Sequence, residues 1–243
     1  MNPTPSSRSR SLVTATALAI GAIVLACQAA PPPTPVSDAR MWQHYREAME
    51  LHIALVDGDV ESATRSARWI TEREAEHALP PNSGRFVDSL NAYADQVATA
   101  QSLTQAAMPA ANVARMCGDC HQNYAVPINF TLLDPPSSRH GHDPATEMQR
   151  HAWGVDRLWE GLVAPSDELW KEGAGVFVEA GLRPMDFPGG AAASGMIREL
   201  EARVHELGQR AVLAETPQDR ATLFAELTTT CVACHEGFRG VGP

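Results

Sequence analysis

Two short motifs in this chain carry residue types that can hold a cofactor covalently. Cys117-Gly118-Asp119-Cys120-His121 and Cys231-Val232-Ala233-Cys234-His235 share the pattern C-x-x-C-H. Two thiols at this spacing can add to the two vinyl groups of one haem, and the adjacent histidine can then bind the iron. The sequence therefore predicts two covalently bound haem c groups. The attachment residues are Cys117, Cys120, Cys231 and Cys234, and the proximal iron ligands are His121 and His235.

Zinc binding is the main alternative to haem attachment for these motifs. A structural zinc site needs four converging ligands, here drawn from motifs that begin at positions 117 and 231. The two motifs use every cysteine of the chain except Cys27. In an exported protein an unligated cysteine pair tends to form a disulfide, and covalent haem removes that outcome. The repeated motif therefore favours haem over zinc.

The N-terminus predicts export and lipid attachment. Arg8 and Arg10 precede an apolar stretch, Leu12–Leu25, which is typical of a signal peptide and short for a transmembrane helix. The residues Val24-Leu25-Ala26-Cys27 resemble a bacterial lipobox, which implies a signal peptide over 1–26 and a lipid on Cys27. The alternative is an ordinary signal with an incidental cysteine.

The segment after the cysteine favours a membrane tether. Residues 27–36 contain Pro31-Pro32-Pro33-Thr34-Pro35, which predicts a stiff, extended linker. Residue 28 is glutamine, which by resemblance to enterobacterial sorting signals does not indicate retention in the inner membrane. We therefore expect a protein anchored in the cell envelope and facing the periplasm, with the outer membrane favoured.

The composition predicts an all-α protein. Aromatic residues make up only 6% of the chain, while alanine, leucine and glutamate dominate. The formal net charge of −10 makes a nucleic-acid partner unexpected. The sequence has no glycine-rich phosphate loop and no recognisable Ser-His-Asp arrangement.

The sequence also indicates a duplication. Met41-x-x-His44 in the first half matches Met148-x-x-His151 in the second, and Leu55 and Leu162 follow at the same spacing. In each half the methionine, the histidine and the leucine occupy one apolar stripe of a helix, as expected for the seam of a bundle. Each half ends on a C-x-x-C-H motif.

Helix signals divide each half into four helices. In the first half they predict helices over 37–58 and 59–77, a third carrying Phe86 to Val97, and a fourth that starts after Pro109. In the second half they predict helices from Pro144 and after Ser166, a loop over 183–195, a helix carrying Ile197 to Leu207, and a last helix from Thr216. We expect two tandem four-helix bundles, 37–125 and 143–243, joined by a linker over 126–142.

Four helices with C-x-x-C-H near the end of the fourth resemble the cytochrome c′ family, including its low-spin, six-coordinate relatives. The specific part of the resemblance is Ala111–Tyr124, and a tandem pair departs from the usual single-domain member. The resemblance implies that the first helix of each half faces the distal side of its haem. This brings His44 and His151 near the irons as expected distal ligands, with Met41 and Met148 as rivals. The family also includes five-coordinate haems.

These features predict an electron carrier rather than an enzyme. Its partners would be redox proteins of the cell envelope, and covalent haem suits this role because the cofactor cannot be lost. A gas-binding or sensing cytochrome with a five-coordinate haem that takes NO or CO is the alternative. A dihaem peroxidase is a weaker third hypothesis. Enzymes of that kind are longer, and they use class I cytochrome c domains, in which C-x-x-C-H lies near the start of the domain.

Overall fold

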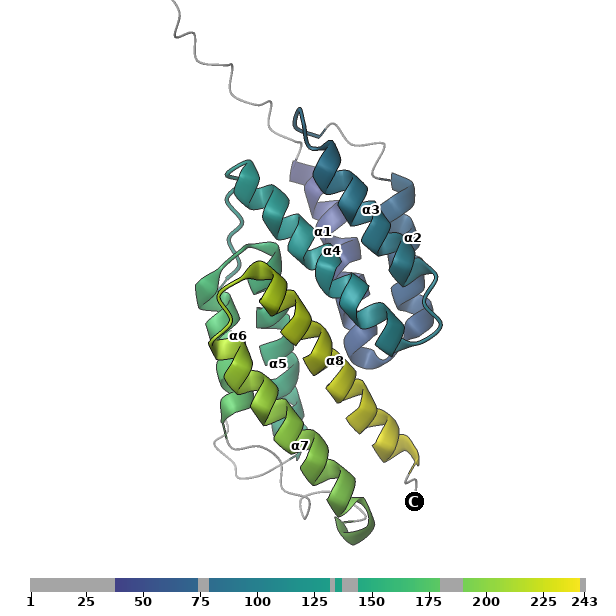
Figure 1. The fold of residues 1–243 in the computed structure, drawn as a ribbon, viewed down its shortest axis with the longest axis vertical. Helices are drawn as coiled ribbons and strands as arrows, with labels where there is room; N and C mark the ends of the chain where they lie inside the picture. The colour runs from purple at the N-terminus through teal and green to yellow at the C-terminus, as the bar shows by residue number, and fades with distance from the viewer. Residues whose placement is uncertain (1–37, 74–78, 132–133, 137–143, 180–189, 241–243) are drawn as a thin grey trace, which may run out of the picture. The chain divides into compact units, whose positions relative to one another are not determined.

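The computed structural model describes residues 38–73, 79–131, 134–136, 144–179 and 190–240 (Figure 1). This part of the chain is all-α, as predicted, and its eight helices pack as two groups. The first group is α1 (Asp38–Asp57), α2 (Val60–Arg73), α3 (Gly84–Ala98) and α4 (Leu103–Asn123). The second group is α5 (Pro144–Val163), α6 (Asp167–Val178), α7 (Gly190–Val212) and α8 (Pro217–Gly240).

Several predicted elements lie outside the described residues. These are the signal peptide over 1–26, Cys27 with its tether up to residue 36, and much of the linker over 126–142. Their predictions therefore stay predictions. No helix in the described ranges is both long and apolar enough to cross a membrane.

The predicted start of the fourth helix is wrong. α4 begins at Leu103 rather than after Pro109, which lies inside the helix. Ser102 caps it, with its hydroxyl accepting a hydrogen bond from the Gln105 N–H at 3.3 Å. Pro109 cannot donate to the carbonyl of Gln105, but the cap and the burial of Ala106 and its neighbours outweigh the loss of this one bond.

The predicted loop before the seventh helix is too long. The sequence predicts irregular structure over 183–195, whereas α7 begins at Gly190. Three consecutive alanines, Ala191 to Ala193, explain the early start, because alanine has the highest helix propensity. The starts of α6 and α8 agree with the prediction: Ser166 accepts from the Leu169 N–H and Thr216 from the Asp219 N–H.

Within each group, helices that follow one another in the chain pack side by side, and α4 and α8 pack together across the two groups (Figure 1). α8 is therefore buried on two sides. Its Phe224 belongs to a core cluster that also holds Trp159 and Trp170, whereas its Val232 belongs to the cluster around Leu55 of α1. Both helices that carry C-x-x-C-H thus lie in the interior between the groups.

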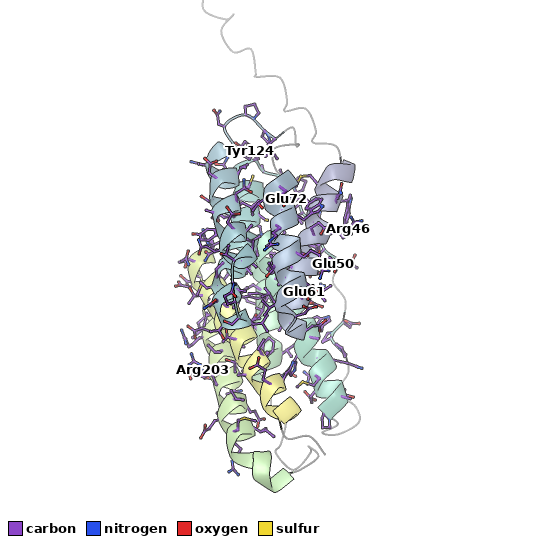
Figure 2. All side chains as sticks on the ribbon, turned by 90° about the vertical axis from the view of Figure 1, so that its right-hand side faces the viewer. Arg46, Glu50, Glu61, Glu72, Tyr124 and Arg203 are labelled. Carbon is purple, nitrogen blue, oxygen red and sulfur yellow. The ribbon has the colours of Figure 1, made fainter. Side chains whose placement is uncertain are left out.

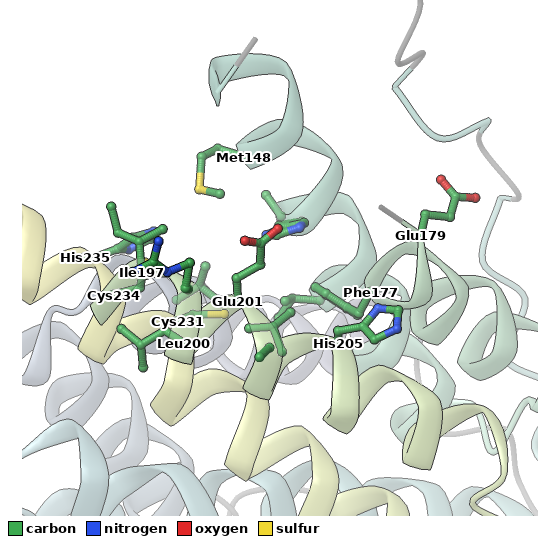
Figure 3. Close-up of a pocket in the computed structure, with 17 residues that line it drawn as sticks. Met148, Phe177, Glu179, Ile197, Leu200, Glu201, His205, Cys231, Cys234 and His235 are labelled. Atoms are coloured by element: carbon green, nitrogen blue, oxygen red, sulfur yellow. The ribbon is translucent and has the colours of Figure 1, made fainter. Parts of the chain in front are cut away.

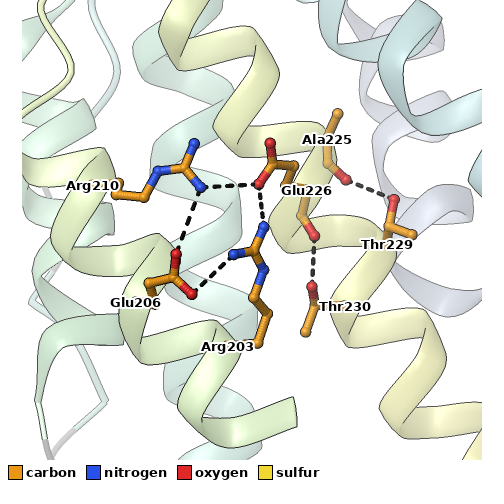
Figure 4. Close-up of polar contacts among 7 residues, drawn as sticks. All are labelled: Arg203, Glu206, Arg210, Ala225, Glu226, Thr229 and Thr230. Carbon is orange, nitrogen blue, oxygen red and sulfur yellow. Dashed lines mark hydrogen bonds and ion pairs between the residues drawn. The ribbon is translucent and has the colours of Figure 1, made fainter. Parts of the chain in front are cut away.

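Charged side chains cover the outer faces. Arg46 and Glu50 on α1 and Glu61 on α2 are exposed (Figure 2). On the other group, Arg203 of α7 donates to Glu226 of α8 at 2.6 Å, and Arg210 reaches the same carboxylate at 3.3 Å (Figure 4). These partly exposed ion pairs align α7 with α8 but contribute little stability individually.

Glycines let α5 and α6 approach closely. A β-carbon at Gly161 of α5 would lie 2.8 Å from the backbone nitrogen of Trp170. One at Gly173 of α6 would lie 2.6 Å from the Gly154 carbonyl oxygen. Real β-carbons essentially never come this close to such atoms. The close crossing buries Trp170 fully and fixes α5, the helix that carries Met148 and His151.

We predict that Gly173→Ala destabilises the protein by about 1–3 kcal/mol, because the new methyl group overpacks the α5–α6 crossing. The matched control is Gly175→Ala on the same helix, where a β-carbon meets nothing within 4 Å. This control should be neutral or stabilising by up to about 1 kcal/mol. Urea unfolding followed by circular dichroism measures both, and equal losses in the two variants would contradict the packing described.

Candidate functional sites

The motif of α8 opens onto a cavity of about 530 Å³ between α5, α7 and α8 (Figure 3). Cys231, Cys234 and His235 line it from α8, while Met148 and His151 line it from α5. Apolar side chains of α7 complete the wall, namely Ile197, Leu200 and Val204. A cavity of this volume lies in the range of pockets that bind cofactors.

His151 is held in the form that can bind a metal. Burial lowers the pKa of His151 to about 4, with smaller contributions from Arg150 and from His235. The His151 ring also packs 5.3 Å from the Phe177 ring. At neutral pH this imidazole is therefore neutral and keeps a free nitrogen lone pair, as a metal ligand requires.

The thiols of this cavity are poor nucleophiles in the folded chain. Burial raises the pKa of Cys231 to about 12, and the neighbouring Cys234 adds to the rise. Burial and Glu201 raise the pKa of Cys234 as well. Redox-active cysteine pairs have the opposite property, a lowered pKa that supplies a thiolate.

The motif of α4 lies at a second, much smaller cavity of about 80 Å³. Met41 and His44 of α1 line it, and His44 is 8% exposed. The α4 residues in its wall include Cys117, Cys120 and His121. At both sites, a methionine and a histidine from the first helix of the group therefore line the same cavity as two thiols and their adjacent histidine.

His121 is oriented by a backbone carbonyl of the other helical group. Its Nδ1 lies 2.9 Å from the carbonyl oxygen of Val163, the last residue of α5. A carbonyl only accepts, so Nδ1 carries the proton and Nε2 keeps the lone pair. Burial lowers the pKa of His121, and the bond to Val163 opposes that shift. Metal-binding histidines commonly have this second hydrogen bond, which fixes tautomer and ring orientation.

The two cavities fit a haem to different degrees. The cavity of α8 has both the donors and the volume, whereas the cavity of α4 has the donors but is smaller than the roughly 300–1,000 Å³ usual for ligand pockets. Phe86, Val87 and Leu90 of α3 line the smaller cavity and take up its room. A macrocycle there requires α3 to lie farther from α4.

A buried polar cluster between the two groups was not signalled by the sequence. His52 of α1 is fully buried, its Nε2 lies 2.7 Å from Asp156 Oδ1 of α5, and its ring stacks on Trp159 at 4.9 Å. Close by on α5, Arg157 donates to Glu160 Oε1 at 2.7 Å, and burial raises the pKa of Glu160 to about 7. His52 shares a helix with His44, but only the partner helix reveals its role.

Glu160 also acts on the cavity of α4. Burial, followed by the charge of Glu160, raises the pKa of Tyr45 to about 12, and Tyr45 lines the cavity beside His44. Arg157 additionally donates to the Thr131 carbonyl at 3.0 Å. The electrostatic surroundings of this wall are thus set partly by residues of the second group.

The structure gathers the residues singled out from the sequence into two sites, one for each motif. Cys27 lies outside the described residues. In the described ranges, no three or more histidine, cysteine or acidic side chains converge as ligands of a single metal ion. The chain matches no protein-family model, no curated protein and no solved structure at a significant level.

Proposed function

We propose that this protein is a dihaem c-type cytochrome that carries electrons in the bacterial cell envelope. The observation that carries the proposal is the repeated geometry: each C-x-x-C-H motif borders a cavity that also receives a methionine and a histidine from the first helix of its group. A single cavity lined by such candidate iron ligands and thiols would be weak support for haem binding. Its repetition at equivalent positions of a duplicated chain is strong support.

Each residue type has a defined part in this proposal. Cys117 and Cys120 would hold the first haem through thioether bonds, and Cys231 and Cys234 would hold the second. His121 and His235, next to these cysteines, would be the proximal ligands of the two irons. When bound, the haems supply one-electron chemistry, while the chain supplies ligands, orientation and an apolar surrounding that tunes their potentials.

The properties of the thiols argue against a dithiol oxidoreductase. Such an enzyme needs an accessible cysteine that forms a thiolate near neutral pH. Here burial raises the pKa of both Cys231 and Cys234. A thioether to haem, in contrast, has no proton to lose and suits an apolar cavity.

The proposal assigns the distal positions to His44 and His151. Each lines the same cavity as its neighbouring methionine, Met41 or Met148, so the two residues compete for one coordination position. A neutral imidazole keeps a lone pair for a metal, and burial lowers the pKa of His151 to about 4, which favours this form at neutral pH. Bis-histidine ligation also gives a lower potential than histidine–methionine ligation.

The first test is the haem count. Protein made with a working maturation system should retain two covalent haems after denaturation, because both motifs are complete. Mass spectrometry and the pyridine haemochrome measure this. Changing Cys117 and Cys120 together to alanine should remove one haem and leave the other. A chain that carries no covalent haem would contradict the proposed function.

The second test concerns the distal ligands. We expect low-spin spectra for both haems, no charge-transfer band of methionine-bound ferric haem and little binding of CO. His44→Ala should open the first haem to CO and His151→Ala the second, each with its covalent haem retained. Met41→Ala and Met148→Ala are the matched controls and should leave both spectra low-spin.

A different spectroscopic result would change the function. If the unmodified protein has high-spin iron that binds CO, the distal positions are open and gas binding takes the place of electron transfer. If the methionine variants and not the histidine variants become high-spin, the distal ligands are Met41 and Met148.

The third test concerns the place of the protein in the cell. The lipobox-like sequence supports a lipid on Cys27, which would anchor the protein in the envelope, most favourably in the outer membrane. Cys27→Ser should lose lipid and membrane attachment but keep both haems, because two or three acyl chains hold firmly where one is marginal. Equal release of variant and unmodified protein by gentle washing would contradict the anchor.

A further inference from the structure

The C-x-x-C-H motif of each group packs against the C-terminal end of the first helix of the other group. Gly118, in the first motif, faces the end of α5, where a β-carbon on it would collide with the Leu162 carbonyl oxygen. Val232, at the equivalent position of the second motif, lies in the core cluster that holds Leu55 near the end of α1. Leu55 and Leu162 occupy equivalent positions of the duplicated chain.

The two contacts differ by one side chain. Glycine lets the backbone of α4 touch α5, and directly beside that contact His121 reaches the Val163 carbonyl at 2.9 Å. Val56 is the counterpart of Val163 and lines the cavity of His235. In the part of the chain that the structure describes, however, no carbonyl makes the same bond to His235. Val232 is only 4% exposed, so its side chain takes up the space that Gly118 leaves for backbone contact.

We propose that the Val163 carbonyl is a positioning group for the first haem, and that the glycine at position 118 is what gives His121 this bond while His235 lacks it. A hydrogen bond from Nδ1 to a carbonyl makes the imidazole a more basic ligand. A more basic ligand stabilises ferric over ferrous iron, so the bond lowers the reduction potential of the first haem. The second group of helices thereby tunes the cofactor of the first.

This inference rests on the proposed function and adds to it a cause of inequality between the haems. The wall of the first cavity agrees with it, because Val163 belongs to that wall as well as to α5. The two sites have the same types of predicted ligand. They differ in the hydrogen bond of the proximal histidine, which, among the described residues, His121 makes and His235 does not.

The decisive variant is Gly118→Ala. The new methyl group must push α4 away from Leu162 by about an ångström, which lengthens the His121–Val163 bond beyond hydrogen-bonding distance. The C-x-x-C-H pattern stays intact, so covalent attachment should be unaffected. A redox titration should show the potential of the first haem shifted upward and that of the second unchanged. Parallel titration of a chain with Cys231 and Cys234 both changed to alanine assigns the first potential.

Gly175→Ala is the control, because a β-carbon there meets nothing within 4 Å. It should leave both potentials as they are. An unchanged first potential in Gly118→Ala would overturn the inference while the dihaem proposal stands. A chain without covalent haem would overturn both.

A measurement on the unmodified protein keeps the inference testable even if Gly118→Ala does not fold. In the reduced protein, the Nδ1 proton of His121 should exchange with solvent much more slowly than that of His235, as followed by nuclear magnetic resonance. Slow exchange at His121 alone supports the bond to Val163. Equal exchange at the two histidines would overturn it.

Discussion

The packing of α4 between its own group and the end of α5 is the contact on which the α4 site depends. Gly118 has no side chain at the point where the two backbones meet, and a methyl group there would collide with the Leu162 carbonyl. The same contact brings Val163 to His121. This one contact therefore positions the α4 motif and fixes the tautomer of its histidine.

The interior between the groups is polar as well as apolar, which constrains how they pack. His52 and Asp156 pair across it, and Arg157 and Glu160 pair beside it on α5. The Arg157–Glu160 pair lies within one helix, so it does not depend on how α1 packs against α5. The His52–Asp156 contact joins α1 to α5, and another alignment of these helices would leave the buried His52 without this partner. This contact therefore favours a single alignment of α1 against α5.

Local signals in the sequence predict most of the fold. The duplication predicts two groups of helices, and capping residues such as Ser166 and Thr216 locate the helix starts. The errors arise where one local signal outweighs another. Pro109 suggests a helix start although Ser102 supplies a better one, and the alanines after Gly190 extend α7 into a predicted loop. Contacts between the groups are not predictable in the same way. The donors at each site are patterns of residue type, whereas the Val163 carbonyl leaves no such pattern, since every residue has a carbonyl.

The properties of the folded thiols bear on the order of events if the proposed function holds. Because burial raises the pKa of Cys231, its thiol forms little thiolate near neutral pH in the folded chain. α8 is also held between α4 and α7 once the chain has folded. If the chain carries haem as proposed, attachment is therefore favoured before α8 packs, while its cysteines are still solvated. On that order, the interior around α8 would pack around a haem that is already in place.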